Sequence, residues 1–356
     1  MRRSHARMTS NQKKKRMDQT LVLPQSWTGP GLIDLQVNGY AGFDFKTPAE
    51  EWTLENLRHV RRAAARRGVL AIFPTLTTGD GEAMVARARK YAELLARDPS
   101  VEAAFPKLHI EGPFISGDDG PRGAHRRKWR RDPRDAPDLL ARLQAASGGR
   151  VGILTLAPEL PGAMELIREA AAQGICVAIG HTGASAEIIA AAVEAGARMS
   201  THLGNGSHQM LPRLDNYVQA QLADDRLAAS FIADGHHIPF FTLKNFLRAK
   251  TAARSILVTD AIAAAEVGPG KYVLGGEDVI VTEALRCYKP GQPNLAGSAL
   301  TLDRAVINAC VHCGVPFEEA WAMASAIPAS LLGLASVPSV SVRVHSDHFE
   351  NRAPVD

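Results

Sequence analysis

The sequence predicts a (β/α)8 barrel, a fold of the α/β class, on three observations. Short apolar, β-branched runs alternate with longer amphipathic ones, the pattern of βα units around a parallel sheet. The chain has 356 residues, 46% hydrophobic and 22% charged, which suits a barrel that commonly needs roughly 250 residues or more. Chemistry-bearing residues also recur where the apolar runs end. A doubly wound open sheet is the alternative.

Eight strands are expected, each an apolar run bounded by turn or helix signals. They should lie, in chain order, at 31–38, 69–76, 107–114, 151–158, 175–182, 197–205, 227–235 and 255–261. Eight such units are the number that closes a parallel barrel.

The segments between the strands have helical signals. "AEEWTLENLRHVRRAAARRG" (49–68) is preceded by Thr47 and Pro48 and carries Glu50, which predicts a cap residue, a proline at the first helical position and a capping acid. "PGAMELIREAAAQG" and "SAEIIAAAVEAG" each end at a glycine, as helices commonly do.

Three segments follow from these expectations. Residues 1–27 form a basic tail without an apolar stretch behind it, residues 28–335 form the barrel, and residues 336–356 form a short C-terminal extension without a strand-rich ending. The absence of a secretory pattern and of any apolar run of about 20 residues predicts a cytoplasmic protein with no membrane partner.

Charge and cysteine usage exclude other classes. The net charge is only +4, and the basic run "PRGAHRRKWRRDPR" (121–134) has no aromatic interleaving, so no nucleic-acid partner is expected. This run is expected to be a solvated loop, or one that attracts an anionic substrate. The four cysteines are expected to be free thiols, and "CVHC" (310–313) lacks the second ligand pair of a zinc clip.

The strand ends carry the candidate site, because barrel active sites gather there. The polar residues at these ends are Gln36, Asn38, Thr75, Glu111, Glu159, His181, His202, Asp234 and Asp260. A single buried His or Glu is more often a satisfied structural residue, but one carboxylate and two imidazoles with an open position suit a catalytic metal that activates water. Glu111, His181 and His202 fill those roles, and Asp260 is a further carboxylate that could move protons.

Eight phrases in order resemble one family. "HIEGPF", "GAH", "TLAPE", "GHT", "THLGN", "IADGHHI", "LVTDA" and "LAGSALTLDRAV" are similar to those of the N-acetylglucosamine-6-phosphate deacetylases, in the amidohydrolase superfamily. The resemblance spans about residues 28 to 334. It implies a metal-dependent (β/α)8 barrel, a small β-sandwich from both chain ends, here absent or vestigial, and removal of acetate from the 2-acetamido group of a sugar phosphate.

The resemblance also implies residue roles. Glu111, His181 and His202 match the family's metal ligands, Asp260 matches the general base and acid, and His125 matches the histidine that polarises the amide carbonyl. Further matches contact the substrate, with 296–298 in the loop that closes over the sugar; these are Asn205, Gly206, His237, Ala296, Gly297 and Ser298.

Gln36 and Asn38 stand where many amidohydrolases have the His-x-His that holds a second metal. Capping of loose backbone groups near a turn is their other interpretation. Because neutral amides are poor zinc ligands, the resemblance implies one divalent ion per subunit, zinc being expected and iron or another ion remaining open. Gln36 and Asn38 would then line the site.

The phosphate contact is less well matched. The family's His-Arg-Glu-Pro-Gly stretch is replaced by "SHQMLPRLDN", in which Arg213 or His208 could substitute. The substrate could therefore be another, unphosphorylated N-acyl amino sugar. A cyclic-amide hydrolase and a non-catalytic sugar-phosphate-binding barrel remain alternatives. The expected partners are a small-molecule substrate and a second copy in a homodimer.

Overall fold

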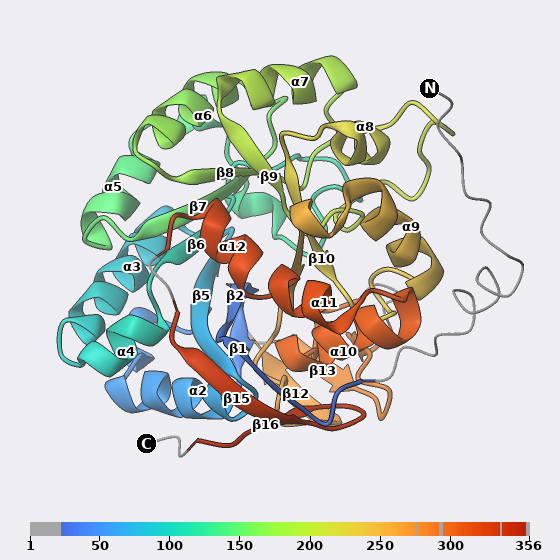
Figure 1. Ribbon diagram of the computed structural model, residues 1–356. Coiled ribbons are helices and arrows are strands. Elements are labelled where there is room, and N and C mark those ends of the chain that lie inside the picture. Colours follow the sequence, from blue (N-terminus) through green and yellow to red (C-terminus); the bar gives the residue numbers. More distant parts are fainter. Residues whose placement is uncertain (1–22, 275–276, 292–294, 335–336, 354–356) are drawn as a thin grey trace, which may run out of the picture.

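Eight parallel strands form the centre of the molecule (Figure 1). The structure is a computed structural model that describes residues 23–274, 277–291, 295–334 and 337–353. Neighbouring strands follow one another in chain order, which confirms the predicted barrel and its eight strands. The barrel strands are β2 (Leu32–Val37), β5 (Val69–Thr77), β6 (Leu108–Glu111), β7 (Val151–Leu156), β8 (Cys176–Ile179), β9 (Ala197–Ser200), β10 (Ala228–Ile232) and β11 (Ser255–Val258).

Helices surround these strands (Figure 1). Apolar side chains of the strands and helices form one buried cluster. The α-helices are α2 (Leu54–Arg66), α3 (Gly81–Leu95), α4 (Pro99–Ala104), α5 (Leu139–Ala146), α6 (Ala163–Ala172), α7 (Ala186–Ala195), α8 (Tyr217–Ala223), α9 (Phe240–Lys250), α10 (Leu302–Cys313), α11 (Phe317–Met323) and α12 (Ala326–Leu331). Short 3-10 turns occur at η1 (Ala49–Glu51), η2 (Arg127–Trp129), η3 (Pro133–Asp135) and η4 (Ala252–Arg254).

The predicted start of the first helix was wrong. Residues 49–51 form only the turn η1, and α2 begins at Leu54 behind Thr53. The Thr53 side chain accepts from Asn56 N, and the Asn56 side chain accepts from Thr53 N. This reciprocal capping box outcompetes the Thr47 cap signal because Trp52, between the two, is buried and ends the turn.

The barrel closes between its first and last strands by a short contact. Val37 forms a parallel bridge with Ala261, and the amides of Asn38 and Gly39 donate to Ala261 O at 2.8 and 3.0 Å. Gly39 is required there, because a Cβ would lie 2.7 Å from Ala263 N. The end of β2 is therefore held close to the residues that follow β11.

The two ends of the described chain meet in a separate antiparallel sheet, β1 (Ser26–Pro30), β15 (Ser339–Val344) and β16 (Phe349–Asn351). The C-terminal extension, which was expected to lack a strand-rich ending, contributes two strands to this sheet. Its "SVSVRV" alternates buried and more exposed residues, and Val342 is fully buried. β1 begins two residues before the expected start of the barrel segment. The described residues contain this single terminal sheet and no second sheet packed on it as a sandwich.

Two further small sheets interrupt the βα pattern, β3 (Gly39–Tyr40) with β4 (Phe43–Asp44), and β12 (Gly270–Leu274) with β13 (Glu277–Val281) and β14 (Cys287–Tyr288). All four cysteines are free, as predicted, and the two of "CVHC" are buried on α10. Within the described ranges, no helix combines the length and apolarity needed to cross a membrane.

Candidate metal centre and active site

Three predicted ligands converge in the barrel mouth. Glu111 Oε1 lies 3.0 Å from His181 Nε2 and 3.1 Å from His202 Nε2, and the two imidazole nitrogens are 3.1 Å apart. All three side chains are buried. They come from the ends of β6, β8 and β9, so parallel strands supply the convergence.

Left-handed backbone turns aim the histidines into the mouth. His181 has φ 53° and His202 has φ 29°, each one or two residues after its strand ends. Non-glycine residues adopt such angles at a cost of order 1–3 kcal/mol, and they cluster at functional sites. The same is true of Asp260, with φ 49° after β11.

Glu111 Oε1, His181 Nε2 and His202 Nε2 form a triangle of ligand atoms that fits a divalent cation. His181 Nδ1 lies 2.8 Å from Pro121 O. Since a carbonyl only accepts, Nδ1 carries a proton, and in the neutral ring the lone pair of Nε2 is available to a cation shared with Glu111. Tetrahedral coordination at the usual zinc distances separates ligand atoms by about 3.3 Å, close to the observed spacing. Glu111, His181 and His125 also qualify together as a possible ligand group.

Electrostatics keep the Glu111 carboxylate charged. Burial alone would raise its pKa, but hydrogen bonds from His181 and His202 hold the pKa well below the ordinary value. For His202, burial opposes the charged ring, yet the contact with Glu111 outweighs it and raises the pKa. The buried Nδ1 of His202 has no hydrogen-bond partner among the described residues.

His125 reaches the same centre from the basic loop. Its Nε2 lies 3.9 Å from Glu111 Oε2, and its ring packs edge-on against His181 with centroids 4.4 Å apart. Burial, followed by the nearby His181, lowers the His125 pKa to about 3, so the ring is neutral near pH 7 and can donate one N–H. Arg122 Nη1 donates to His125 O at 2.6 Å and fixes this part of the loop.

Asp260 and the side-chain amides of Gln36 and Asn38 lie next to the three ligand residues. Asn38 Nδ2 donates to Asp260 Oδ1 at 2.6 Å, and Gln36 Nε2 donates to Glu111 Oε1 at 2.9 Å. Burial and the Glu111 charge raise the pKa of Asp260. The two amides therefore hold carboxylates, so of the two interpretations the geometry supports the one in which they line the site.

The predicted substrate residues lie around this centre. Asn205 Nδ2 donates to His202 O, and a Cβ on Gly206 (φ 55°) would lie 2.7 Å from His181 Nδ1. Ser298 pairs with Ala261 beside Asp260, and its O accepts from Ile262 N at 2.9 Å. Residues 296–298 are therefore adjacent to the segment that follows Asp260.

His237 is held by an aspartate. Its Nδ1 lies 2.6 Å from Asp234 Oδ2, and Asp234 Oδ1 accepts the backbone N–H groups of residues 236 and 237. The His237 ring also lies close enough to Asp260 to offset part of the rise in the Asp260 pKa.

Arg213 is the exception among the predicted residues. It is exposed, and no hydrogen bond or ion pair joins it to the other described site residues. His208 instead contacts Tyr217, with Nδ1 3.1 Å from the hydroxyl oxygen. The structure of one chain therefore does not bring Arg213 into the centre.

Sequence reasoning missed Asp34 and Thr259. Asp34 Oδ2 accepts from the Thr259 hydroxyl at 2.6 Å, and Asp34 Oδ1 accepts from Thr259 N at 3.2 Å. Asp34 has the same strand parity as Gln36, a signal that was available in the sequence. Its partner lies 225 residues away, which no local pattern reveals.

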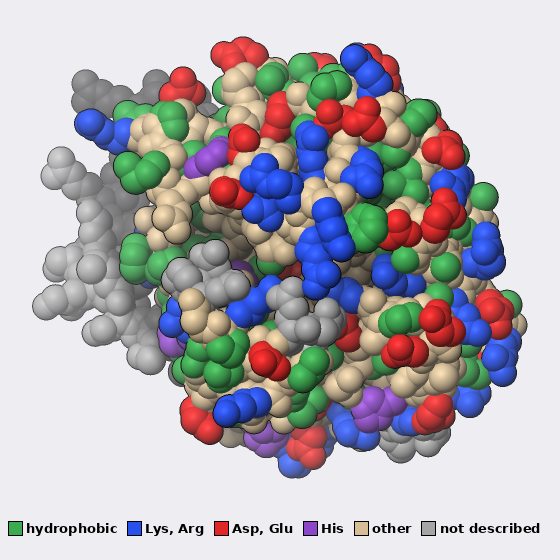
Figure 2. All heavy atoms as spheres, turned by 180° about the vertical axis from the view of Figure 1, so that it is seen from behind, with side chains coloured by type: hydrophobic (Ala, Val, Ile, Leu, Met, Phe, Trp, Pro, Cys, Tyr) green, Lys and Arg blue, Asp and Glu red, His purple; other side chains and the backbone are tan. Residues whose placement is uncertain are grey.

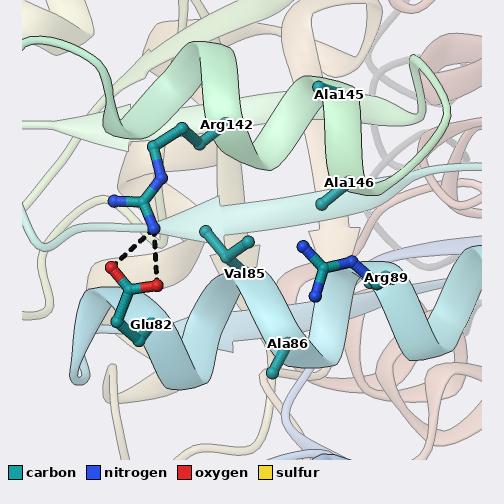
Figure 3. A pocket seen from close by; sticks show the side chains of 7 residues that line it. All are labelled: Glu82, Val85, Ala86, Arg89, Arg142, Ala145 and Ala146. Carbon is teal, nitrogen blue, oxygen red and sulfur yellow. Dashed lines mark hydrogen bonds and ion pairs between the residues drawn. The ribbon is translucent and has the colours of Figure 1, made fainter.

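The surface has a basic region and a separate groove. The face opposite the terminal sheet has Lys and Arg side chains gathered near its middle (Figure 2). In the basic loop, Arg122 and Arg127 pair with Asp119, and Arg130 pairs with Asp132. A groove between α3 and α5, bridged by Arg142 and Glu82 (Figure 3), shares no residue with the candidate metal centre.

Comparison with known proteins places these residues in a family context. A family model described as "Amidohydrolase family" matches residues 29–342. An N-acetylglucosamine-6-phosphate deacetylase of Homo sapiens is 37% identical over 321 residues, covering 86% of this chain and 74% of that protein. An N-acetylgalactosamine-6-phosphate deacetylase of Escherichia coli O157:H7 is 33% identical over 308 residues, covering 86% and 78%.

A solved structure of a protein with the same name as the human relative is also similar to this chain. It is an aspartate-to-alanine mutant of N-acetyl-D-glucosamine-6-phosphate deacetylase from Mycobacterium smegmatis, in complex with N-acetyl-D-glucosamine-6-phosphate. Its TM-score to this chain is 0.79 at 26% identity, covering 91% of this chain and 87% of the other.

Proposed function

The chain belongs to the amidohydrolase family, among the N-acetylglucosamine-6-phosphate deacetylases, and is a hydrolase of an amide bond; from this premise we propose that it hydrolyses the acetamide of N-acetylglucosamine-6-phosphate. The products are acetate and glucosamine-6-phosphate, a step of amino-sugar catabolism. The observation that carries the proposal is the buried triangle of Glu111, His181 and His202 with His125 and Asp260 beside it.

Glu111, His181 and His202 would hold one divalent cation per subunit, zinc first and iron as the alternative. When bound, such a cation acidifies water and polarises a carbonyl. The amide nitrogens of Gln36 and Asn38 donate to Glu111 and Asp260. Their amide oxygens have no hydrogen-bond partner among the described residues, but a neutral amide oxygen is a poorer zinc ligand than imidazole, which supports a mononuclear site.

The protein side chains supply the proton transfers. His125 donates a hydrogen bond to the amide carbonyl oxygen of the substrate as negative charge develops there. Asp260 takes a proton from the attacking water and later gives it to the departing nitrogen, because an amine leaves poorly as an anion. The overall balance is one water consumed, one C–N bond broken, and one acetate and one amine formed.

The sugar would be held by the surrounding groups. Asn205, Gly206 and His237 supply polar contacts, and the loop at Ala296, Gly297 and Ser298 closes beside Asp260. Asp234 fixes the His237 ring so that its Nε2 is the free nitrogen, suited to a phosphate or hydroxyl oxygen of the substrate.

We propose a homodimer as the functional unit. Met210 and Leu214 are 89% and 80% exposed and flank Arg213 on one loop. Contact between two copies through this loop would bury both side chains and carry Arg213 toward the phosphate in the other copy. Light scattering after size exclusion should give a molar mass twice that of the chain. The double variant M210S/L214S should have the molar mass of a single chain. A monomeric wild type would refute this arrangement.

The test of function is acetate release by purified, zinc-loaded protein. N-acetylglucosamine-6-phosphate should be hydrolysed in preference to N-acetylglucosamine and to N-acetylgalactosamine-6-phosphate at matched concentration. Equal rates with and without phosphate would favour the second candidate, deacetylation of an unphosphorylated amino sugar, which the exposed position of Arg213 supports. No acetate from any of them would refute the deacetylase proposal.

A further inference from the structure

A buried carboxylate at the closure of the barrel acts on the proposed catalytic acid without touching it. Asp34 lies on β2, is 2% exposed, and accepts hydrogen bonds from the hydroxyl and the amide of Thr259. It also accepts from Gln36 N at 3.3 Å. The Asp34 carboxylate therefore links Thr259, which directly precedes Asp260, to Gln36. The side chain of Gln36 in turn donates to Glu111.

The Thr259 hydroxyl extends this link past Asp260. While it donates to Asp34, its oxygen accepts from Ala261 N at 3.1 Å. The backbone N–H groups on both sides of Asp260 are therefore held by two side chains: Thr259 N donates to Asp34, and Ala261 N donates to the Thr259 hydroxyl. Asp260 itself is held in the left-handed region, which costs free energy for a non-glycine residue.

Regular backbone pairing between the first and last barrel strands is too limited to hold the backbone around Asp260 by itself. Between β2 and β11 the structure has the single bridge of Val37 with Ala261, and the β2–β5 register shifts between Asp34 and Val37. Side-chain hydrogen bonds through Asp34 and Thr259 hold the amides of residues 259 and 261, in addition to the backbone hydrogen bonds from Asn38 and Gly39 to Ala261 O. A buried carboxylate with three donors, two of them at Thr259, is well suited to holding this backbone.

We propose that Asp34 is a positioning residue that, through Thr259, fixes the left-handed conformation of Asp260 and so aims its carboxylate at the reacting atoms. The proposal rests on the proposed function in assigning Asp260 as base and acid. It concerns orientation, so it predicts a loss in turnover and little change in substrate affinity.

Two substitutions test the link from its two sides. Asp34→Asn keeps the size and one acceptor oxygen but presents an amide N–H₂ to the Thr259 hydroxyl, which therefore loses the carboxylate oxygen it donates to. Thr259→Val removes the hydroxyl, and Thr259→Ser retains it. D34N and T259V should each lower kcat at least tenfold with KM within twofold, the double variant should be no worse than the poorer single, and T259S should stay within twofold of the wild type.

A matched control separates positioning from general destabilisation. Asp303 is also a fully buried aspartate that accepts a backbone amide, Phe349 N at 2.8 Å, but it lies on α10. D303N should lower the melting temperature and leave kcat unchanged. Metal content should equal that of the wild type in all variants, and its loss in D34N would assign Asp34 to the ligands instead.

Hydrogen exchange measured by mass spectrometry decides the proposal even if the wild type releases no acetate. Peptides that span residues 259–262 should exchange at least tenfold faster in D34N and T259V and at the wild-type rate in D303N. Wild-type kcat and wild-type exchange in D34N would overturn the proposal. Additive losses in the double variant, or an equal kcat loss in D303N, would overturn it as well.

Discussion

At the scale of single residues, Asp260 is the most direct test of the chemistry. Asp260→Asn removes the proton acceptor but keeps the size, and Asn tolerates the left-handed backbone better than other residues. The variant should keep its metal and lose nearly all acetate release. Metal analysis and acetate assay on the same sample check this, and full turnover would refute the assignment of base and acid.

Glu111 should be needed for the metal itself. Glu111→Gln removes the negative charge from the triangle and leaves two imidazoles, so metal content after dialysis should fall at least tenfold. Glu102→Gln, at a partly exposed ion pair with Arg150, is the control and should retain the wild-type content. If E111Q keeps a full equivalent of metal, the triangle is not the metal site.

His109 should make stability depend on pH. Burial lowers its pKa from 6.5 to about 4, so between these values the unfolded chain binds a proton that the native protein does not. Stability from this residue is present above pH 6.5 and is lost as the pH falls toward 4, by about 3 kcal/mol in all.

The measurement is the free energy of unfolding of wild type minus that of His109→Gln, from urea titrations at pH 7.5 and 4.5. The difference should shrink at the lower pH. A constant difference would mean that His109 is already charged in the native protein.

Glu111, His181, His202 and Asp260 could be expected together because each ends or follows an apolar strand and the fold brings strand ends to one rim. His125 lies in the loop after β6, and only the family resemblance pointed to it. The contacts that support these residues could not be predicted. Pro121 O on His181 and Asp34 on Thr259 depend on contacts 60 and 225 residues apart along the chain, which no local pattern encodes.

At the scale of elements, the capping box of α2 can be measured directly. Thr53→Ala leaves Asn56 N without its acceptor and should cost about 1 kcal/mol of stability in urea unfolding. Thr47→Ala, at the cap expected from the sequence, should cost less, because its hydroxyl only donates to Asp44 O. A larger loss for Thr47→Ala would restore the earlier start of the helix.

Strands were easier to predict than helix starts for a physical reason. Burial on both sides makes barrel strands continuous apolar runs, whereas two competing caps stood within six residues of each other at α2. Which cap is used depends on the packing of Trp52 against Phe43 and Phe45, a tertiary contact.

At the scale of the whole molecule, the terminal sheet is bound to the barrel by an aromatic cluster. Phe349 is fully buried and packs on Phe317 and Trp321 at centroid distances of 5.9 and 5.5 Å. Phe349→Ala should therefore cost about 3–5 kcal/mol. The exposed Val273→Ala is the control and should change little, and a loss below 1 kcal/mol for Phe349→Ala would show that the sheet is peripheral.

The terminal sheet also has a consequence for synthesis. β1 and β15 are paired across a sequence separation of 313 residues at Thr28 and Ser341. At about 5–20 residues per second, a ribosome completes β15 tens of seconds after β1. During that interval β1, which contains Trp27, has no strand to pair with, so its backbone N–H and C=O groups and an indole ring stay unpaired until the last part of the chain is made.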